Sequence, residues 1–579
     1  MTAVSEDTPA DGMSGDFGRL RDLMRLLDPS YKRRRNIPQR LQGFPYMGRN
    51  SAFVFIAEIA GGEFVGRPCP FRLEATTQCR SSVRRWPRRR SWKEAVAMSL
   101  DSAIILAAGE GTRMKSRRPK TLFTLGGRTF LNRVISAVGA ANPKILSVVV
   151  RYGKDQVEAE ALRAFPKAVI VEQDEIPGTG RAVQCAMSRL AGDIAAIDPR
   201  GDGSVLIAAG DMPLLDASTL SSLMDAHERS GAVATVLTTV LDSPFGYGRV
   251  VRGADGSVEK IVEERDATDG QRAIREVNTS VYVFQTSVLA QAIANLDSQN
   301  DQNEFYLTDA IEFAGNYGRV GAFAAPDSLA VEGVNDRVQL ARLAKAHNRR
   351  VCERWMREGV SILDPDTTWI DDDVRLARDV ELLPNTFLRG RTVVGEGTVI
   401  GPDVELVDMK VGQDARIHRA LMQNSVVGPR AEVGPFSYMR PGCMLGGGAK
   451  QGTCVEMKKS TIGDGTKVPH LSYIGDTTIG DHTNIGGGTI TANYDGKHKN
   501  PTKIGSDVHI GVDNMLVAPV EVADGVTTGA GAVIRHYVHR GSLAYSENTQ
   551  HEVRYWTPKS QRPASSRDNN EKDNKGGAR

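Results

Sequence analysis

The sequence predicts a two-domain α/β protein in which a doubly wound, Rossmann-like domain precedes a left-handed parallel β-helix. Two observations support this fold class. Short apolar strands alternate with amphipathic helices from about residue 103 to residue 344, and a six-residue repeat runs from about residue 392 to residue 534. A chain of 579 residues is long enough for several domains, each with its own core.

Residues 1–100 share neither pattern, and we expect them to form a leader. They contain two basic runs, Lys32–Arg35 and Arg84–Arg90. One interpretation is a nucleic-acid-binding arm. The other is a disordered leader, or sequence upstream of a natural start at Met98, and it is favoured because no RNA-binding motif with interleaved aromatic residues accompanies the charge. We therefore expect residues 1–97 to be dispensable.

Charge and cysteine pattern argue against several classes of protein. The net charge is only +3, so the chain carries no overall nucleic-acid-binding footprint, and we expect no nucleic-acid partner. The six cysteines are scattered without a C-x-x-C pair, which argues against a disulfide framework or zinc site and fits a reducing cytoplasm. No run of 18 apolar residues occurs, so we expect no membrane span and a cytoplasmic protein.

We predict the first domain over residues 101–335. Its strands show little polar alternation, which is typical of a mostly parallel sheet buried between helix layers. The predicted strands are Ala103–Leu106, Leu146–Val150, Val205–Ala208, Ala234–Leu237 and Val281–Phe284. The predicted helices are Leu131–Gly139, Gln156–Ala164, Thr179–Leu190 and Thr219–Glu228. Ligands of such folds bind at the carboxyl ends of the strands.

A glycine-rich loop follows the first predicted strand. Leu106–Met114 reads LAAGEGTRM, and Gly109 and Gly111 have no Cβ to keep backbone N–H groups away from a phosphate. Arg113 and Lys120 add positive charge for the same phosphates. The spacing matches neither the Walker motif nor the dinucleotide-binding fingerprint. An ordinary turn between strand and helix is the alternative, and the two basic residues argue against it.

An acidic residue follows another strand end. Gly210 and Asp211 come directly after Val205–Ala208, a position at which a carboxylate near a phosphate loop could bind Mg²⁺. Without the phosphate loop, a helix N-cap or turn acid would be the better interpretation.

The second half of the chain changes period. Residues 336–362 are predicted to form a charged linker helix, 363–556 the β-helix and 557–579 a disordered tail with almost no apolar residues. In the repeat an aliphatic residue precedes a glycine, as in Val394-Gly395 and Ile400-Gly401. We expect the aliphatic residues to stack inside the prism and the glycines to permit its corners. Interruptions near Met409, Leu445–Met457 and Thr491–Thr502 indicate insertions or looser turns.

Polar residues interrupt this repeat. Basic residues from several coils could converge on one phosphate, and a neutral histidine is the usual base for an amine that attacks a thioester. Alone, His470 would be a surface histidine. Its neighbours favour a catalytic role for His470, because the same region contains Arg440, Lys458, Tyr473 and Lys499.

Residues 103–360 resemble the uridylyltransferase half of the bifunctional enzymes of UDP-N-acetylglucosamine synthesis. The resemblance rests on LAAGEGTRM with Pro119-Lys120, Gln173, Gly178-Thr179-Gly180, Gly210-Asp211, Gly246-Tyr247-Gly248-Arg249, Val262-Glu263, Glu276-Val277-Asn278-Thr279 and Glu332-Gly333-Val334-Asn335. It implies that UTP and the product are held by Leu106, Ala107, Ala108, Gly109, Lys120, Gln173, Gly178, Thr179, Gly210, Gly248, Glu263, Asn278 and Asn335. Arg113 and Lys120 would face the phosphates, and Asp211 and Asn335 would bind Mg²⁺.

The β-helix resembles the acetyltransferase half of the same enzymes through the stretches RPG, EMKK, HLSYIGD and TANYDG. The resemblance implies that His470 accepts the proton with Glu456 nearby. The sugar phosphate would be held by Arg440, Lys458, Tyr473, Asn484 and Lys499, and acetyl-CoA by Gly487, Asn493, Tyr494, Val512 and Ala530. Val512 stands where the family usually has serine, so one hydrogen bond near the thioester is missing, and Glu547 stands where many members have an arginine able to meet CoA phosphate, a role for which its charge is wrong.

The leading hypothesis is therefore a two-site enzyme that acetylates glucosamine-1-phosphate and then uridylylates the product. The resemblance also implies a homotrimer in which neighbouring subunits complete each acetyl-transfer site. One alternative is a single-activity sugar-nucleotide pyrophosphorylase with a structural or regulatory β-helix. A second is a non-catalytic scaffold or RNA-binding protein that uses the basic leader.

Overall fold

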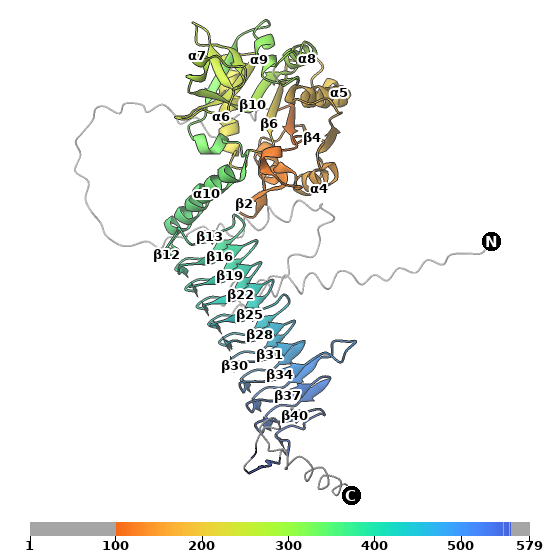
Figure 1. Ribbon diagram of the computed structural model, residues 1–579, viewed down its shortest axis with the longest axis vertical. Coiled ribbons are helices and arrows are strands. Elements are labelled where there is room, and N and C mark those ends of the chain that lie inside the picture. Colours follow the sequence, from red (N-terminus) through yellow and green to blue (C-terminus); the bar gives the residue numbers. More distant parts are fainter. Residues whose placement is uncertain (1–99, 301, 548, 555, 557–579) are drawn as a thin grey trace, which may run out of the picture. The chain divides into compact units, whose positions relative to one another are not determined.

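The computed structural model describes residues 100–556 except 301, 548 and 555 (Figure 1). The predictions for the leader and for the tail concern residues outside this part of the chain. No helix within it is long and apolar enough to cross a membrane.

The first domain is built on a nine-stranded sheet. Its main strands run in the order β11-β7-β10-β6-β1-β4-β5. Their bounds are β1 Ser102–Leu106, β4 Ile145–Val150, β5 Val169–Glu172, β6 Ser204–Ala209, β7 Ala234–Val240, β10 Glu276–Gln285 and β11 Val320–Ala324, with β8 Arg249–Arg252 and β9 Val258–Val262 beside β10. β1 pairs in parallel with both β4 and β6, whereas β10 runs antiparallel to β6 and β7. The sheet is therefore mixed: its β6-β1-β4-β5 part and its β11-β7 pair are parallel, and β10 between them is antiparallel to its neighbours.

Helices cover both faces of this sheet, which confirms the doubly wound class. They are α3 Phe130–Ala140, α4 Lys154–Ala164, α5 Thr179–Ile197, α6 Ala217–Ser230, α7 Asp269–Arg272, α8 Thr286–Ala294, α9 Asp309–Ala314 and α10 Arg337–Arg357. One core contains apolar residues of α3, α4 and α6, and a separate core contains those of α5, α8 and α9. Capping fixes several ends: Asp216 accepts a hydrogen bond from Thr219 N at the start of α6, and Gly231 closes it in the left-handed region.

Short elements complete the domain. The 3₁₀ helices are η2 Thr112–Met114, η3 Lys120–Leu122 and η4 Ser328–Val331, and β2 Thr124–Leu125 pairs with β3 Arg128–Thr129. The hairpin of β2 and β3 directly follows η3, so it connects the segment that carries Lys120 with α3.

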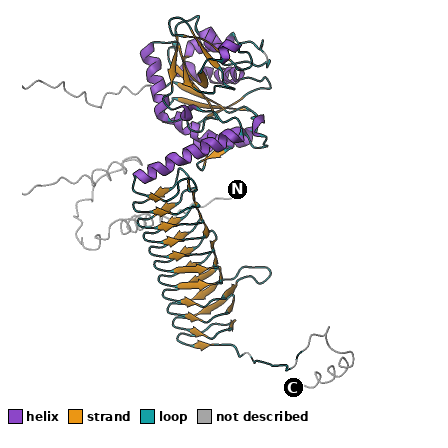
Figure 2. Ribbon diagram, turned by 60° about the vertical axis from the view of Figure 1, so that its left-hand side comes forward, coloured by secondary structure: helices purple, strands orange, loops and turns teal. Residues whose placement is uncertain are grey.

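The second domain is a stack of coils with three parallel sheets along its sides, as Figure 2 shows. The β12 sheet contains β12 Ser361–Ile362, β15 Glu381–Leu382, β18 Val399–Ile400, β21 Arg416–Ile417, β24 Glu432–Val433, β27 Lys450–Thr453, β30 Lys467–His470, β33 Asn484–Ile485, β36 His509–Ile510, β39 Thr527–Thr528 and β41 Leu543–Ala544. The β13 sheet contains β13 Trp369–Ile370, β16 Thr386–Arg389, β19 Val404–Val407, β22 Ala420–Gln423, β25 Ser437–Met439, β28 Glu456–Lys458, β31 Tyr473–Gly475, β34 Ile490–Ala492, β37 Met515–Val517 and β40 Val533–Ile534. The β14 sheet contains β14 Arg375–Leu376, β17 Val393–Val394, β20 Lys410–Val411, β23 Val426–Val427, β26 Met444–Leu445, β29 Thr461–Ile462, β32 Thr477–Ile479, β35 Thr502–Ile504 and β38 Val520–Val522.

The aliphatic residues of the repeat stack inside this prism as predicted. Val394, Ile400 and Val411 are each at most 5% exposed and belong to one continuous core. The coils also extend toward the N-terminus beyond the recognisable repeat, because Ile370-Asp371 and Leu376-Ala377 occupy strand ends without the glycine signature.

Most glycines of the repeat do not act as expected, although Gly401 does adopt a positive φ, of 111°. Gly395 and Gly412 do not adopt the left-handed region, and most left-handed corners are formed by other residues, among them Asp403 and Asp414. Instead, a Cβ on Gly395 would lie 2.6 Å from Gln413 N, and one on Gly412 would lie 2.6 Å from Pro429 N. These glycines are needed because the backbone of the next coil passes too close for a side chain.

Only one of the three predicted interruptions is an insertion. Met409 is fully buried, and Leu445–Met457 contains the regular strand β27. Between β34 and β35, by contrast, the chain leaves the stack as an arm in which Tyr494 bridges Lys499 in antiparallel fashion (Figure 1 and Figure 2).

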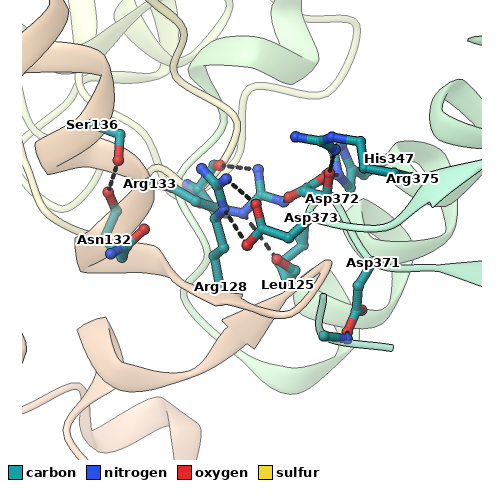
Figure 3. A network of polar contacts seen from close by, with 12 residues as sticks. Leu125, Arg128, Asn132, Arg133, Ser136, His347, Asp371, Asp372, Asp373 and Arg375 are labelled. Carbon is teal, nitrogen blue, oxygen red and sulfur yellow. Dashed lines mark hydrogen bonds and ion pairs between the residues drawn. The ribbon is translucent and has the colours of Figure 1, made fainter. Parts of the chain in front are cut away.

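A charged network joins the first coil to the first domain. Figure 3 shows Arg128 and Arg133 pointing toward Asp372 and Asp373. Arg133 pairs with Asp372, and Arg128 pairs with Asp373. His347 Nε2, from α10, lies 2.7 Å from Asp372 Oδ1 and 3.0 Å from Arg133 Nη2.

The two ion pairs differ in burial. The side chains of Arg133 and Asp372 are 11% and 16% exposed, whereas those of Arg128 and Asp373 are both 37% exposed. Burial alone would raise the pKa of Asp372, but the hydrogen bond with His347 and the charge of Arg133 outweigh it and lower that pKa. The carboxylate is therefore held in its ionised form at the junction.

Asp372→Ala should lower the free energy of unfolding by about 3–5 kcal/mol, because it leaves Arg133 buried without its partner. Thermal unfolding at neutral pH measures the effect. The neighbouring Asp373→Ala is the matched control and should cost at most about 1 kcal/mol, because its pair is more exposed. Because folding lowers the pKa of Asp372, its ionised carboxylate stabilises the fold at every pH above the ordinary pKa of an aspartate. The difference in unfolding free energy between the wild type and Asp372→Ala should therefore shrink only below about pH 4. Equal effects of the two substitutions would contradict this account.

Candidate functional site

The principal cleft of the first domain opens at the carboxyl ends of β1 and β6. Its volume is about 800 Å³. The predicted site residues that line it are Leu106, Ala107, Ala108, Gly109, Arg113, Lys120, Gln173, Gly178, Thr179, Asp211, Glu263, Asn278 and Asn335. Gly210 and Gly248 are not in the lining but support it: Gly210 N donates to Leu106 O at 2.9 Å, and Gly248 O accepts from Asn278 N at 2.9 Å.

The glycine-rich loop leaves space on the cleft side. A Cβ at Gly109 would meet nothing within 4 Å, so this position is open to a ligand. Gly111 has a φ of 65°, and a Cβ there would lie 2.6 Å from Lys120 Cβ. Gly111 is therefore required for the close approach of Lys120 to the loop.

Positive charge gathers at one end of the cleft. Lys120 Nζ pairs with Asp211 and donates to Asn335 Oδ1 at 3.0 Å. Arg113 Nη2 donates to the same Asn335 oxygen at 2.8 Å. The start of α10 fixes Asn335, whose N–H donates to Gln339 Oε1 at 2.7 Å. Groups that are far apart in the sequence thus meet where a phosphate chain would need charge neutralisation.

The donor set at this end fits a magnesium ion. Asp211 and Asn335 direct oxygen atoms toward the same ammonium group, so both oxygens face one point. Mg²⁺ prefers oxygen ligands and takes few from the protein, completing its shell with water and phosphate oxygens. Within the described residues, no group of three or more His, Cys, Asp or Glu side chains could hold a metal ion. The pair therefore suits an ion that is shared with a bound phosphate.

The opposite side of the loop is shaped by backbone contacts. Gln173 Nε2 donates to Ile176 O at 2.8 Å and to Gly178 O at 3.2 Å. Gly178 has a φ of 120°, and a Cβ there would overlap the main chain of Phe305. Thr179 Oγ1 accepts from Leu307 N at 3.1 Å. These contacts pack Gln173, Gly178 and Thr179 closely against the segment around Phe305 at this edge of the cleft.

Two further residues position the polar groups at the remaining side of the cleft, and the sequence did not indicate them. Thr308 Oγ1 donates to Glu263 Oε1 at 3.3 Å, and Asn278 Nδ2 donates to Tyr282 Oη at 2.7 Å. Burial raises the pKa of Glu263, and the nearby charges of Asp266 and Asp309 add to the effect. A ligand that donates hydrogen bonds to this carboxylate would favour its ionised form.

On the β-helix, four predicted residues form a column. His470, Gly487, Val512 and Ala530 each lie three residues after members of one ladder, in which Lys467 pairs with Asn484, Asn484 with His509 and His509 with Thr527. Three strand spacings of about 4.8 Å give the column a length of about 14 Å. A Cβ on Gly487 would lie 3.2 Å from His470 Cβ, so this glycine keeps the space beside the histidine free.

Other predicted residues meet on the β13 sheet. Lys458 Nζ lies 3.0 Å from Asp476 Oδ2, and the same oxygen accepts a hydrogen bond from Asn493 Nδ2. Asn493 Nδ2 also lies 3.4 Å from Tyr473 Oη. In the arm, Lys499 Nζ lies 4.1 Å from the centre of the Tyr494 ring.

Some predicted partners are separated. Glu456 contacts Arg440, with 3.3 Å between Oε1 and Nη1, and no hydrogen bond reaches the His470 imidazole from any residue in the described part of the chain. Asn484 lies in the β12 sheet, whereas Lys458 and Tyr473 lie in the β13 sheet. One chain thus presents these groups on two sides of an exposed prism.

The chain is similar to known proteins over most of its length. Residues 103–300 match the family model of the MobA-like NTP transferase domain. The chain is 60% identical over 464 residues to the bifunctional protein GlmU of Bifidobacterium longum strain NCC 2705, covering 80% of this chain and 99% of the relative. It is 61% identical over 468 residues to that of Bifidobacterium adolescentis, covering 80% and 100%.

A solved structure, the apo form of a UDP-glucose pyrophosphorylase, aligns with 44% of this chain and 99% of its own at 15% identity. Its TM-score of 0.36 is too low to carry an argument about function.

Gly178→Ala should weaken the binding of UTP at least tenfold, because the new Cβ must displace the Phe305 backbone and a φ of 120° strains any other residue. Isothermal titration measures the affinity. Gly192→Ala in α5 is the matched control, since its Cβ would meet nothing within 4 Å. A Gly178→Ala protein that binds as tightly as Gly192→Ala would show that this edge of the cleft is not used.

Proposed function

Because the chain belongs to the GlmU family of bifunctional enzymes, we propose that its two catalytic sites are the cleft of the first domain and the polar groups on the outside of the β-helix. The protein makes UDP-N-acetylglucosamine. It transfers an acetyl group from acetyl-CoA to glucosamine-1-phosphate, and it then transfers a uridylyl group from UTP to N-acetylglucosamine-1-phosphate and releases pyrophosphate. The observation that carries this conclusion is the 60% identity that extends through both domains over 99% of the relative.

The single-activity alternative is not favoured. The relatives that the chain matches over nearly their whole length are bifunctional proteins, and both halves are present here. The scaffold alternative is not favoured for the same reason.

In the cleft, uridylyl transfer needs no protein nucleophile. An oxygen of the sugar phosphate attacks the α-phosphorus of UTP, the bond to the β-phosphate breaks, and pyrophosphate leaves. We assign Lys120 and Arg113 to the phosphates, where their charge would stabilise the transition state. Gln173, Gly178 and Thr179 would hold the uridine.

We assign the remaining predicted cleft residues to the sugar and to Mg²⁺. Glu263 and Asn278 would accept and donate hydrogen bonds at the sugar, with Gly248 behind them. Asp211 and Asn335 would hold Mg²⁺, which supplies positive charge beside the phosphates when it is bound.

On the β-helix, we assign His470 as the group that takes the proton from the attacking 2-amino group as the thiolate of CoA leaves. The column that continues through Gly487, Val512 and Ala530 is about as long as an extended pantetheine arm needs, which supports acetyl-CoA binding along it. Arg440, Lys458, Tyr473, Asn484 and Lys499 would hold the sugar phosphate. The exposed Glu547 lies just past the end of this column, where its negative charge opposes CoA phosphates.

We also propose a homotrimer, because one chain leaves these groups on separate sides. The outer residues of the β13 sheet support this, because eight of the ten in its ladder are apolar or aromatic, namely Trp369, Phe387, Leu421, Tyr438, Tyr473, Ile490, Met515 and Val533; the other two are Glu405 and Glu456. The equivalent ladder of the β12 sheet is more polar, because five of its eleven residues are charged, namely Glu381, Arg416, Glu432, Lys450 and Lys467. A long apolar face of this kind fits contact with other copies of the chain.

A cytoplasmic location is the last part of the proposal. The four cysteines in the described part of the chain, Cys185, Cys352, Cys443 and Cys454, are free, as expected of a protein in a reducing compartment.

Asp211→Ala should reduce pyrophosphate release by at least about 10²-fold and leave CoA thiol release unchanged, because the carboxylate belongs only to the cleft.

His470→Ala should reduce thiol release by about 10²–10⁴-fold and leave uridylylation of supplied N-acetylglucosamine-1-phosphate near normal. Separate assays of thiol and of pyrophosphate check both. Loss of both activities in either folded variant would contradict the assignment.

Leu421→Asp should convert the trimer to smaller species and abolish acetyl transfer, because it places a charge in the apolar ladder, where Leu421 is 37% exposed. Light scattering measures the mass, and pyrophosphate release serves as the internal check on folding. Arg416→Asp, in the same coil but on the β12 sheet, is the matched control and should remain trimeric. An active Leu421→Asp monomer would disprove the shared site.

A further inference from the structure

Asp476 ties together three successive coils beside the groups assigned to the sugar phosphate. It lies directly after β31 with a φ of 50°, a left-handed corner that aspartate and asparagine tolerate. Its Oδ2 lies 3.0 Å from Lys458 Nζ on one neighbouring coil and accepts from Asn493 Nδ2 on the other. The side chains of Lys458 and Asp476 are 20% and 18% exposed, so the pair is largely shielded from water.

The same residue holds both ends of the arm between β34 and β35. The arm begins at Asn493, whose side chain binds the Asp476 carboxylate, and the chain re-enters the stack at Thr502, whose N–H donates to Asp476 O at 3.1 Å. Asn500 N donates to Asn493 O at 2.7 Å and closes the base of the arm. The direction of the arm is therefore set at Asp476.

Packing fixes the neighbouring aromatic ring in the same unit. A Cβ on Gly475 would lie 2.5 Å from Tyr473 Oη and 2.6 Å from Asn493 Nδ2, so both side chains cross this glycine closely. Asn493 is only 5% exposed. Tyr473, Asn493 and Lys458 thus reach one carboxylate or its immediate surroundings.

We propose that Asp476 is a positioning residue of the acetyl-transfer site, which sets Lys458 and the arm that carries Tyr494 and Lys499 in one fixed geometry. The proposal rests on the proposed function of this site. A carboxylate that accepts from a lysine and an amide restricts both donors through charge-assisted hydrogen bonds. Without it, Lys458 keeps its charge but loses its orientation, and the arm loses its side-chain anchor.

The test compares Asp476→Asn with Asp507→Asn. Asparagine keeps the shape and tolerates the left-handed corner, and Asp507, with a φ of 55°, is a matched corner away from these groups. Asp476→Asn should lower kcat/KM for acetyl transfer roughly 10- to 100-fold, with higher KM values for both glucosamine-1-phosphate and acetyl-CoA. Asp507→Asn should leave acetyl transfer unchanged, and pyrophosphate release should be normal in both.

Two further measurements separate positioning from a general structural role. In a double-mutant cycle, Asp476→Asn should lower acetyl transfer by a smaller factor in the Lys458→Ala background than in the wild type, because the interaction with Lys458 is already gone and only the anchor of the arm remains to be lost. Trypsin should cleave the arm at Lys497 or Lys499 faster in Asp476→Asn, and likewise in Asn493→Ala, which removes only the partner. Unchanged kinetics, additive effects in the cycle, or unchanged cleavage of the arm would overturn the proposal. Absence of acetyl transfer in the wild type would instead overturn the proposed function of the site.

Discussion

Main-chain pairing between successive coils is the constraint on which the second domain depends. Because each strand hydrogen-bonds to the equivalent strand one coil later, Lys467 lies opposite Asn484 and Asn484 lies opposite His509, although the arm lengthens the chain between the last two. The same register puts His470 at the head of a column and aligns a ladder of mostly apolar or aromatic side chains along the β13 sheet. The column proposed to bind acetyl-CoA and the face proposed for self-association therefore both depend on one repeated spacing.

The two proposed sites differ in how completely one chain builds them. The cleft of the first domain is formed by loops that follow different strands, and its cations already meet Asp211 and Asn335 at hydrogen-bonding distance. Such pre-organisation suits a reaction that needs charge neutralisation and alignment more than proton transfer. The β-helix instead presents its groups on the outside of a prism, where the regular stacking fixes their spacing along the axis but does not enclose a substrate.

Sequence patterns predicted what depends on local periodicity and missed what depends on close approach. The strand Ala103–Leu106 and helix Thr179–Leu190 were visible because burial on both faces and helical amphipathicity leave strong signals. The antiparallel direction of β10 was not, because apolar composition carries no information about strand direction. The role of Gly395 was misjudged because its neighbour, Gln413, belongs to the next coil. The sequence did not indicate the roles of Thr308 and Asp476, because only the fold brings their partners close to them.

Because Arg133 is buried in its pair with Asp372, deleting the β-helix and substituting Asp372 should affect the first domain differently. Removing the whole β-helix would uncover Arg133 and let water solvate it, whereas neutralising the aspartate alone would keep the guanidinium covered and unsolvated. A shortened chain can thus be better tolerated than a full-length one with a single altered side chain. We therefore expect the first domain to tolerate removal of the β-helix better than neutralisation of Asp372 in the full chain.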